Sequence, residues 1–104
     1  MATGDNPVME TLMEINAASL AHTELDPRSL LLVRIAALVA TDAPISSYLL
    51  HIGPAAEAGL GVSDVEDVLV AVAPIVGTPR AMTAVAKIAE ALDLAIQLGT
   101  EDTE

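Results

Sequence analysis

His51 is the side chain of this sequence best suited to proton transfer. An imidazole gains or loses its charge within the physiological pH range, so it can serve as a general acid or a general base. The chain has no cysteine, which excludes disulfides, thiolate metal sites and thiol redox chemistry within this chain. We therefore predict that His51 is a catalytic residue. The alternative is a structural histidine inside a helix, bonded to a backbone carbonyl or to a carboxylate at an interface.

Three further side chains are candidates for binding a substrate beside His51, namely Ser47, Arg34 and Arg80. Ser47 precedes the histidine at the i, i+4 spacing that places two side chains on one face of a helix. A guanidinium can bind a carboxylate in bidentate fashion, so the arginines are predicted to hold a small carboxylated metabolite. A serine nucleophile is not predicted, because no third group that would orient the histidine is apparent. The structural alternative for the arginines is ion pairing with Glu57, Glu66 or Asp67.

The charge of the chain restricts its partners. Fifteen Asp and Glu residues against four Lys and Arg residues give a formal net charge of -11. Nucleic acids and anionic membranes both attract clustered basic residues, so neither is predicted as a partner. The second histidine, His22, is far from His51 in the sequence, and no set of residues has metal-ligand spacing. The sequence therefore predicts neither a metal site nor a cofactor.

The apolar content of the chain indicates association with other copies of itself. The 104 residues are enough for one domain, and 53% of them are hydrophobic, with Tyr48 as the single aromatic residue. A domain of this size hides only about two thirds of its surface, so we expect a homo-oligomer with an apolar interface. A membrane span needs roughly 18 or more consecutive apolar residues, and Arg34 and Pro74 interrupt the most apolar segments. The N-terminus has no signal-peptide pattern, so a cytoplasmic location is expected.

Capping signals divide the chain into helices. A capping residue followed by proline occurs at 6–7, 26–27 and 78–79, and apolar residues recur at helical spacing after each pair. No segment alternates as a strand does. We therefore predict an all-α fold of five or six helices. The predicted organisation is a flexible tail over 1–6, a single helical domain over 7–99 and an acidic tail over 100–104.

The segment around His51 contains further helix signals. Pro54 removes one helical hydrogen bond, so a kink or a restart of the helix is expected near His51. Gly59 is predicted to end this helix. Ser63 and Glu66 match the capping box in which each side chain binds the backbone N–H of the other, and they are predicted to open the next helix.

The order of these signals from Leu25 to Leu92 resembles the carboxymuconolactone decarboxylase family, whose small helical fold is shared with the alkyl hydroperoxidase D type thiol peroxidases. The matching features are Asp26-Pro27-Arg28, His51 followed by Ala56-Glu57-Ala58-Gly59, the helix start from Gly61 to Glu66, and the junction Gly77-Thr78-Pro79-Arg80-Ala81. The resemblance implies an oligomer, commonly a trimer or a hexamer. It also implies that His51 is the helix histidine of the family.

The resemblance further separates two kinds of chemistry. The redox branch of the superfamily places cysteines seven and four residues before the helix histidine, where this chain has Pro44 and Ser47, so thiol peroxidase activity is not expected. The decarboxylase branch acts on a lactone acid with loss of carbon dioxide. This implies a cofactor-independent lyase in which His51 transfers a proton. The alternative, of a different class, is a non-catalytic oligomeric scaffold or a small-molecule-binding protein.

Overall fold

The computed structural model describes residues 6–102, and five α-helices account for most of them. The described part of the chain contains no strand, which confirms the predicted all-α class. The helices are α1 (Pro7–His22), α2 (Pro27–Ala40), α3 (Ile45–Glu57), α4 (Val62–Val76) and α5 (Thr78–Asp102). The last helix continues beyond residue 99, where the sequence predicted its end. The predictions for the tails at 1–5 and 103–104 lie outside the described residues.

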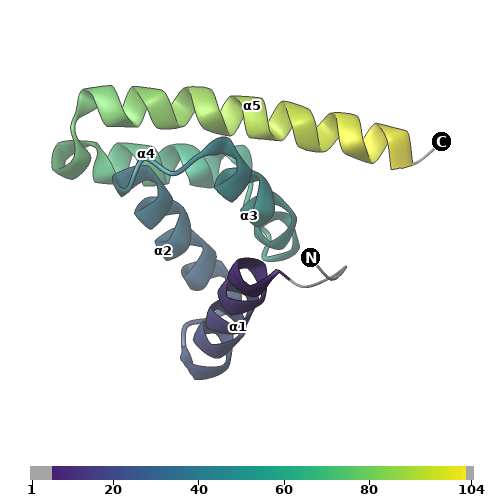
Figure 1. Ribbon diagram of the computed structural model, residues 1–104. Coiled ribbons are helices and arrows are strands. Elements are labelled where there is room, and N and C mark those ends of the chain that lie inside the picture. Colours follow the sequence, from purple (N-terminus) through teal and green to yellow (C-terminus); the bar gives the residue numbers. More distant parts are fainter. Residues whose placement is uncertain (1–5, 103–104) are drawn as a thin grey trace.

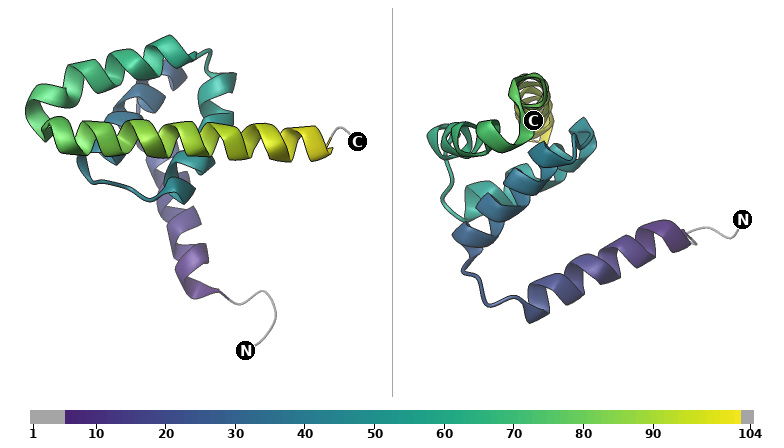
Figure 2. Two further views of the ribbon diagram at one scale, coloured as in Figure 1. Left: turned by 90° about the horizontal axis from the view of Figure 1, so that it is seen from above. Right: turned by 90° about the vertical axis from the view of Figure 1, so that its left-hand side faces the viewer.

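Four of the helices form the packed body of the domain. The long α5 lies alongside α4, and α2 and α3 pack across this pair, α2 mainly on α4 and α3 mainly on α5 (Figure 1). The core lies where these helices meet and consists of Val39, Ala43, Tyr48, Ala84 and Ala91. The first helix, α1, projects away from this body, as both views of Figure 2 show. None of the described helices is long and apolar enough to cross a membrane.

Local capping interactions explain where α1 and α2 begin. The side chain of Asn6 accepts a hydrogen bond from the backbone N–H of Met9 at 3.1 Å. Asp26 accepts two bonds from Ser29, one from its N–H at 3.1 Å and one from its hydroxyl at 2.7 Å. These bonds from Ser29 lower the pKa of Asp26 from its ordinary value. Each cap is followed by proline, so the predicted starts of both helices are confirmed.

The predicted capping box at the start of α4 is wrong, because the helix begins before Ser63. The helix begins at Val62 with Gly61 as its N-cap, so Ser63 and Glu66 both lie inside the helix and do not form the box. Instead, a carboxylate oxygen of Asp64 accepts a hydrogen bond from the N–H of Gly61 at 2.8 Å. Because glycine has no side chain, only this half of the reciprocal pair forms. The bond lowers the pKa of Asp64, and Arg28 contributes to the shift.

The helix that carries His51 is continuous, although it contains a proline. Pro54 lies inside α3, which runs unbroken from Ile45 to Glu57, so the predicted restart near His51 is wrong. The carbonyl that loses its helical donor belongs to Leu50, whose residue is 73% exposed, and water can satisfy a carbonyl at such a site. The predicted end of the helix at Gly59 is confirmed, since Gly59 has a φ of 84°.

Candidate functional site

His51 lies on α3 with one ring nitrogen bound to its own helix. Nδ1 is 2.8 Å from the backbone carbonyl oxygen of Ser47, one turn earlier. A carbonyl oxygen only accepts hydrogen bonds, so Nδ1 carries the proton and donates it. In the neutral ring, Nε2 is then the unprotonated nitrogen with a free lone pair. A bond to a backbone carbonyl is what the structural alternative for His51 predicts, but it occupies only Nδ1. Nε2 remains available to a ligand.

A cavity of about 440 Å³ lies beside His51, within the packed body of the domain. Helices α2 to α5 and the turn between α3 and α4 all contribute to its wall. The residues that line it are Ile35, Tyr48, His51, Ile52, Ala55, Ala56, Leu60, Gly61, Val62, Val65, Glu66, Leu69, Val85, Ile88, Ala89, Ala91 and Leu92. The wall is therefore mainly aliphatic, and it contains Glu66 but no lysine or arginine.

Tyr48 forms part of the same wall through its ring. The residue is 4% exposed, and its hydroxyl has less than 1 Å² of accessible surface and no hydrogen-bond partner among the described residues. Burial raises the pKa of the phenol, and the negative charge of Asp42 raises it further. Tyr48 therefore stays neutral and acts as an apolar surface of the site.

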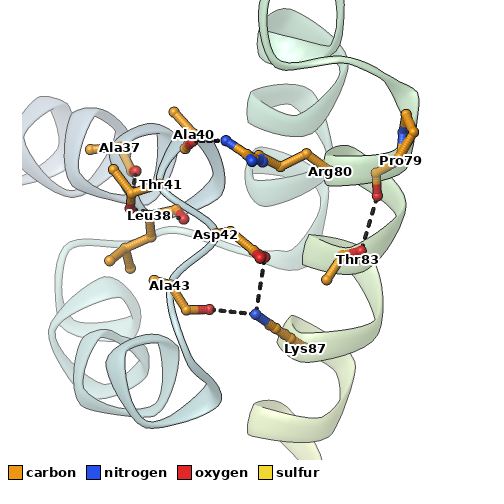
Figure 3. Close-up of polar contacts among 10 residues, drawn as sticks. All are labelled: Ala37, Leu38, Ala40, Thr41, Asp42, Ala43, Pro79, Arg80, Thr83 and Lys87. Atoms are coloured by element: carbon orange, nitrogen blue, oxygen red, sulfur yellow. Dashed lines mark hydrogen bonds and ion pairs between the residues drawn. The ribbon is translucent and has the colours of Figure 1, made fainter.

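Arg34 and Arg80 lie elsewhere and do not line this cavity. The guanidinium of Arg34 donates to the side-chain oxygens of Asn16, at 2.6 Å, and Ser19, at 2.9 Å, and so links α2 to α1. Arg80 donates to the carbonyl oxygen of Ala40 at 2.8 Å, at the C-terminal end of α2 (Figure 3). Both arginines thus bind neutral oxygens. The ion pairs predicted for them, with Glu57, Glu66 or Asp67, are not formed among the described residues.

Ser47, predicted to bind a substrate, contacts His51 through its backbone and is not among the residues that line the cavity. The i, i+4 spacing does bring Ser47 and His51 together, but the carbonyl of the serine is the group in contact. The described residues include no bond between the serine hydroxyl and the imidazole. The arrangement therefore orients the histidine and offers no activated serine nucleophile.

Lys87 fixes the start of α3, and with it the position of His51. Its ammonium group donates to the carboxylate of Asp42 at 3.0 Å and to the carbonyl of Ala43 at 2.9 Å (Figure 3). Asp42 has a φ of 54°, a left-handed conformation that aspartate tolerates better than most residues. The turn between α2 and α3 is thus held against α5.

The sequence profile of the carboxymuconolactone decarboxylase family matches residues 6–91. The chain belongs to the carboxymuconolactone decarboxylase family. No curated protein and no solved structure matches it. As a cysteine-free member of the family, the chain has no thiol with which to carry out peroxidase chemistry.

His51 is a titratable side chain that the sequence analysis predicted for the site and that also lines the cavity. Sequence reasoning missed Glu66 and Tyr48 as members of the wall, and it missed the aliphatic side chains of α4 and α5. The presence of Tyr48 within one turn of His51 was a usable signal, whereas Glu66 approaches only through tertiary packing. Among the residues that the structure describes, no group of three or more His, Asp or Glu could hold a metal ion.

Proposed function

We propose that this member of the carboxymuconolactone decarboxylase family binds a small, uncharged, largely apolar molecule that carries a hydroxyl or another hydrogen-bond donor. The observation that supports this function is the position of His51 on the wall of an aliphatic cavity, with Nδ1 occupied by the Ser47 carbonyl. Nε2 of the neutral ring accepts the donor of the ligand, and the aliphatic wall contacts the rest of it.

The charges around the cavity support an uncharged ligand. Glu66 is the charged residue of the wall, and a ligand carboxylate would lie near it without a compensating cation. Removing a carboxylate from water without a partner is strongly unfavourable. Arg34 and Arg80, the residues predicted to hold a carboxylated metabolite, are bound to other groups. The lining of this chain therefore favours a neutral ligand over a carboxylate.

Three probes of equal chain length test this function. Octanol has a hydroxyl, its methyl ether has no donor, and octanoate carries a charge. We expect octanol to bind most tightly, by about fivefold over the ether, because a single hydrogen bond contributes about 1 kcal/mol. Octanoate is expected to bind most weakly near neutral pH. Binding is measured by ligand-observed NMR and by the shift of the thermal unfolding midpoint.

Matched histidine variants complete this experiment. His51→Phe keeps an apolar ring at the site but removes both nitrogens, so it should abolish the preference for octanol over the ether. His22→Phe makes the same change on exposed α1 and should preserve that preference. Tighter binding of octanoate than of octanol would refute the proposal, as would an unchanged preference in a folded His51→Phe variant.

A lyase-type proton transfer is the second candidate function, and the free Nε2 of His51 favours it. A neutral imidazole held beside a bound ligand can remove a proton from a carbon next to a carbonyl group. Cyclohexanone in deuterated water is a suitable probe, because NMR detects the exchange of its acidic C–H groups. Exchange that the wild-type protein accelerates and His51→Phe does not would support this function. Equal exchange in both proteins, or none above the buffer rate, would contradict it.

A further inference from the structure

The turn between α3 and α4, residues 58–61, forms part of the cavity wall. Leu60 and Gly61 of this turn and Val62, the first residue of α4, all line the cavity. The two helices that the turn joins both contribute to the wall, yet neither packs against the other. Direct contacts between α3 and α4 therefore do not fix the position of the turn, and other interactions must hold it.

Bonds within the backbone close the end of α3. The N–H of Gly59 donates to the carbonyl of Ala56 at 3.0 Å. The N–H of Leu60 donates to the carbonyl of Ala55, also at 3.0 Å. With the left-handed φ of 84° at Gly59, these bonds form a Schellman motif, which ends a helix. The motif uses neither the carbonyl of Gly59 nor the N–H of Gly61.

Arg28 and Asp64 bind these two remaining groups of the turn. Nη1 of Arg28 donates to the carbonyl oxygen of Gly59 at 3.2 Å, and Nη2 donates to the carboxylate of Asp64 at 2.6 Å. The other carboxylate oxygen of Asp64 accepts from the N–H of Gly61 at 2.8 Å. Arg28 lies in the first turn of α2. This connected set of bonds therefore ties the α3–α4 turn to a third helix.

The ion pair between Arg28 and Asp64 is partly open to solvent. The side chains are 47% and 24% exposed, respectively, and an ion pair at such a site contributes little to the free energy of unfolding. Its effect on geometry is larger, because a planar guanidinium that donates to two acceptors fixes their relative positions. The pair therefore determines where the turn lies more than how stable the whole domain is.

We propose that Arg28 is a positioning residue that holds the α3–α4 turn in the cavity wall and so limits the length of the ligand that the cavity accepts. The inference rests on the proposed function, because it concerns the ligand of the same cavity. While the turn is held, Leu60 and Val62 are a fixed part of the wall, and an apolar chain that fills the cavity gains no further contacts as it lengthens. Without the two bonds of Arg28, the turn yields and a longer chain fits.

Straight-chain alcohols from pentanol to decanol test this limit. In the wild type, each added methylene should strengthen binding by about fourfold until the chain fills the cavity, after which the affinity should stop rising. Arg28→Met keeps an unbranched side chain but removes both hydrogen bonds, so its affinity should continue to rise at chain lengths where that of the wild type no longer does. Ligand-observed NMR measures the affinities.

Two further variants serve as controls. Arg34→Met makes the same change at an arginine that links α2 to α1 by two hydrogen bonds outside the cavity, and it should retain the wild-type limit. Arg28→Lys should also retain it, because Lys87 binds a carboxylate and a carbonyl with one ammonium group. The inference is overturned if Arg28→Met keeps the wild-type limit, or if Arg34→Met loses the limit to the same extent.

Amide hydrogen exchange tests the role of Arg28 without a ligand. Exchange of the Leu60 N–H reports opening of the turn, and that of the Ala91 N–H, in the buried part of α5, reports the stability of the whole domain. The ratio of the Leu60 rate to the Ala91 rate should rise about fivefold in Arg28→Met and stay unchanged in Arg34→Met.

The two measurements separate this inference from the proposed function. An unchanged exchange ratio in Arg28→Met, together with a wild-type preference for octanol over its ether, would refute the inference alone. If no alcohol binds the wild type, the proposed function and the length limit both fail, and a raised ratio would then support only the contact of Arg28 with the turn.

Discussion

The hydrogen bond from Nδ1 of His51 to the carbonyl of Ser47 determines which ring nitrogen can react. Without it, either tautomer of a half-buried imidazole would be available. With it, the neutral ring offers a lone pair at Nε2. The i, i+4 spacing made the proximity of Ser47 and His51 predictable. The choice of the carbonyl over the hydroxyl was not, because it depends on the rotamer of the imidazole.

The buried hydroxyl of Tyr48 provides a test of the core. It has no hydrogen-bond partner among the residues that the structure describes, and an unpaired buried polar group costs about 1–3 kcal/mol. Tyr48→Phe should therefore raise the free energy of unfolding, by about 1 kcal/mol, as measured by urea denaturation. Tyr48→Ala is the matched control and should lower it by about 3–5 kcal/mol through the cavity it leaves. A clear loss of stability in Tyr48→Phe would show that the hydroxyl has a partner.

At the level of helices, the starts of α1 and α2 were predictable because the caps are local. Asn6 and Asp26 each bind a backbone N–H three residues ahead, so both partners of each bond lie within four consecutive residues. The start of α4 was misassigned because several carboxylates, those of Asp64, Glu66 and Asp67, follow Ser63 closely. Asp64, which the sequence pattern passed over, binds Gly61 and also Arg28 of α2. The second bond depends on tertiary packing, which the sequence pattern does not contain.

Asp64 makes the stability of α4 dependent on pH. Its bond from the Gly61 N–H, supported by Arg28, lowers the pKa of the carboxyl from the ordinary value of 3.8. A lowered pKa in the folded state means that the stabilisation is present above this ordinary value. It is lost as the pH falls below 3.8 and through the folded-state pKa. Urea denaturation at a series of pH values should show this loss.

Two asparagine variants separate this effect from general acid denaturation. Asp64→Asn removes the titrating carboxylate that accepts from Gly61, so its stability should fall less steeply with pH than that of the wild type. Asp67→Asn changes an exposed carboxylate on the same helix, which accepts no hydrogen bond within residues 6–102, and should retain the steep fall. Identical pH profiles for Asp64→Asn and the wild type would rule out this account of the cap.

For the whole molecule, the all-α class followed from helical periodicity and the absence of strand patterns. The cavity could not be predicted from these patterns, because its wall combines α2, α3, α4 and α5. Sequence alone does not specify how helices cross. Likewise, the apolar composition predicted self-association but did not locate its surface. The exposure of α1 residues such as Val8 and Ile15 was not predictable either, because it depends on how this helix leaves the body of the domain.

The net charge of -11 should make the predicted self-association sensitive to salt. Like charges on neighbouring copies repel one another, and salt screens this repulsion over a Debye length of about 10 Å at 0.1 M. Since the interface expected from the composition is apolar, added sodium chloride should strengthen self-association in sedimentation experiments. Dissociation of the assembly by salt would instead indicate that ion pairs hold the subunits together.

The protonation of His51 is the most direct test of the proposed site. A long-range ¹H–¹⁵N NMR spectrum, recorded where the ring is neutral, distinguishes the two tautomers, and His22 serves as an internal reference. We predict a protonated Nδ1 and an unprotonated Nε2 whose resonance shifts when octanol is added. The opposite tautomer, with the proton on Nε2, would contradict the account, as would an Nε2 resonance that does not respond to bound octanol.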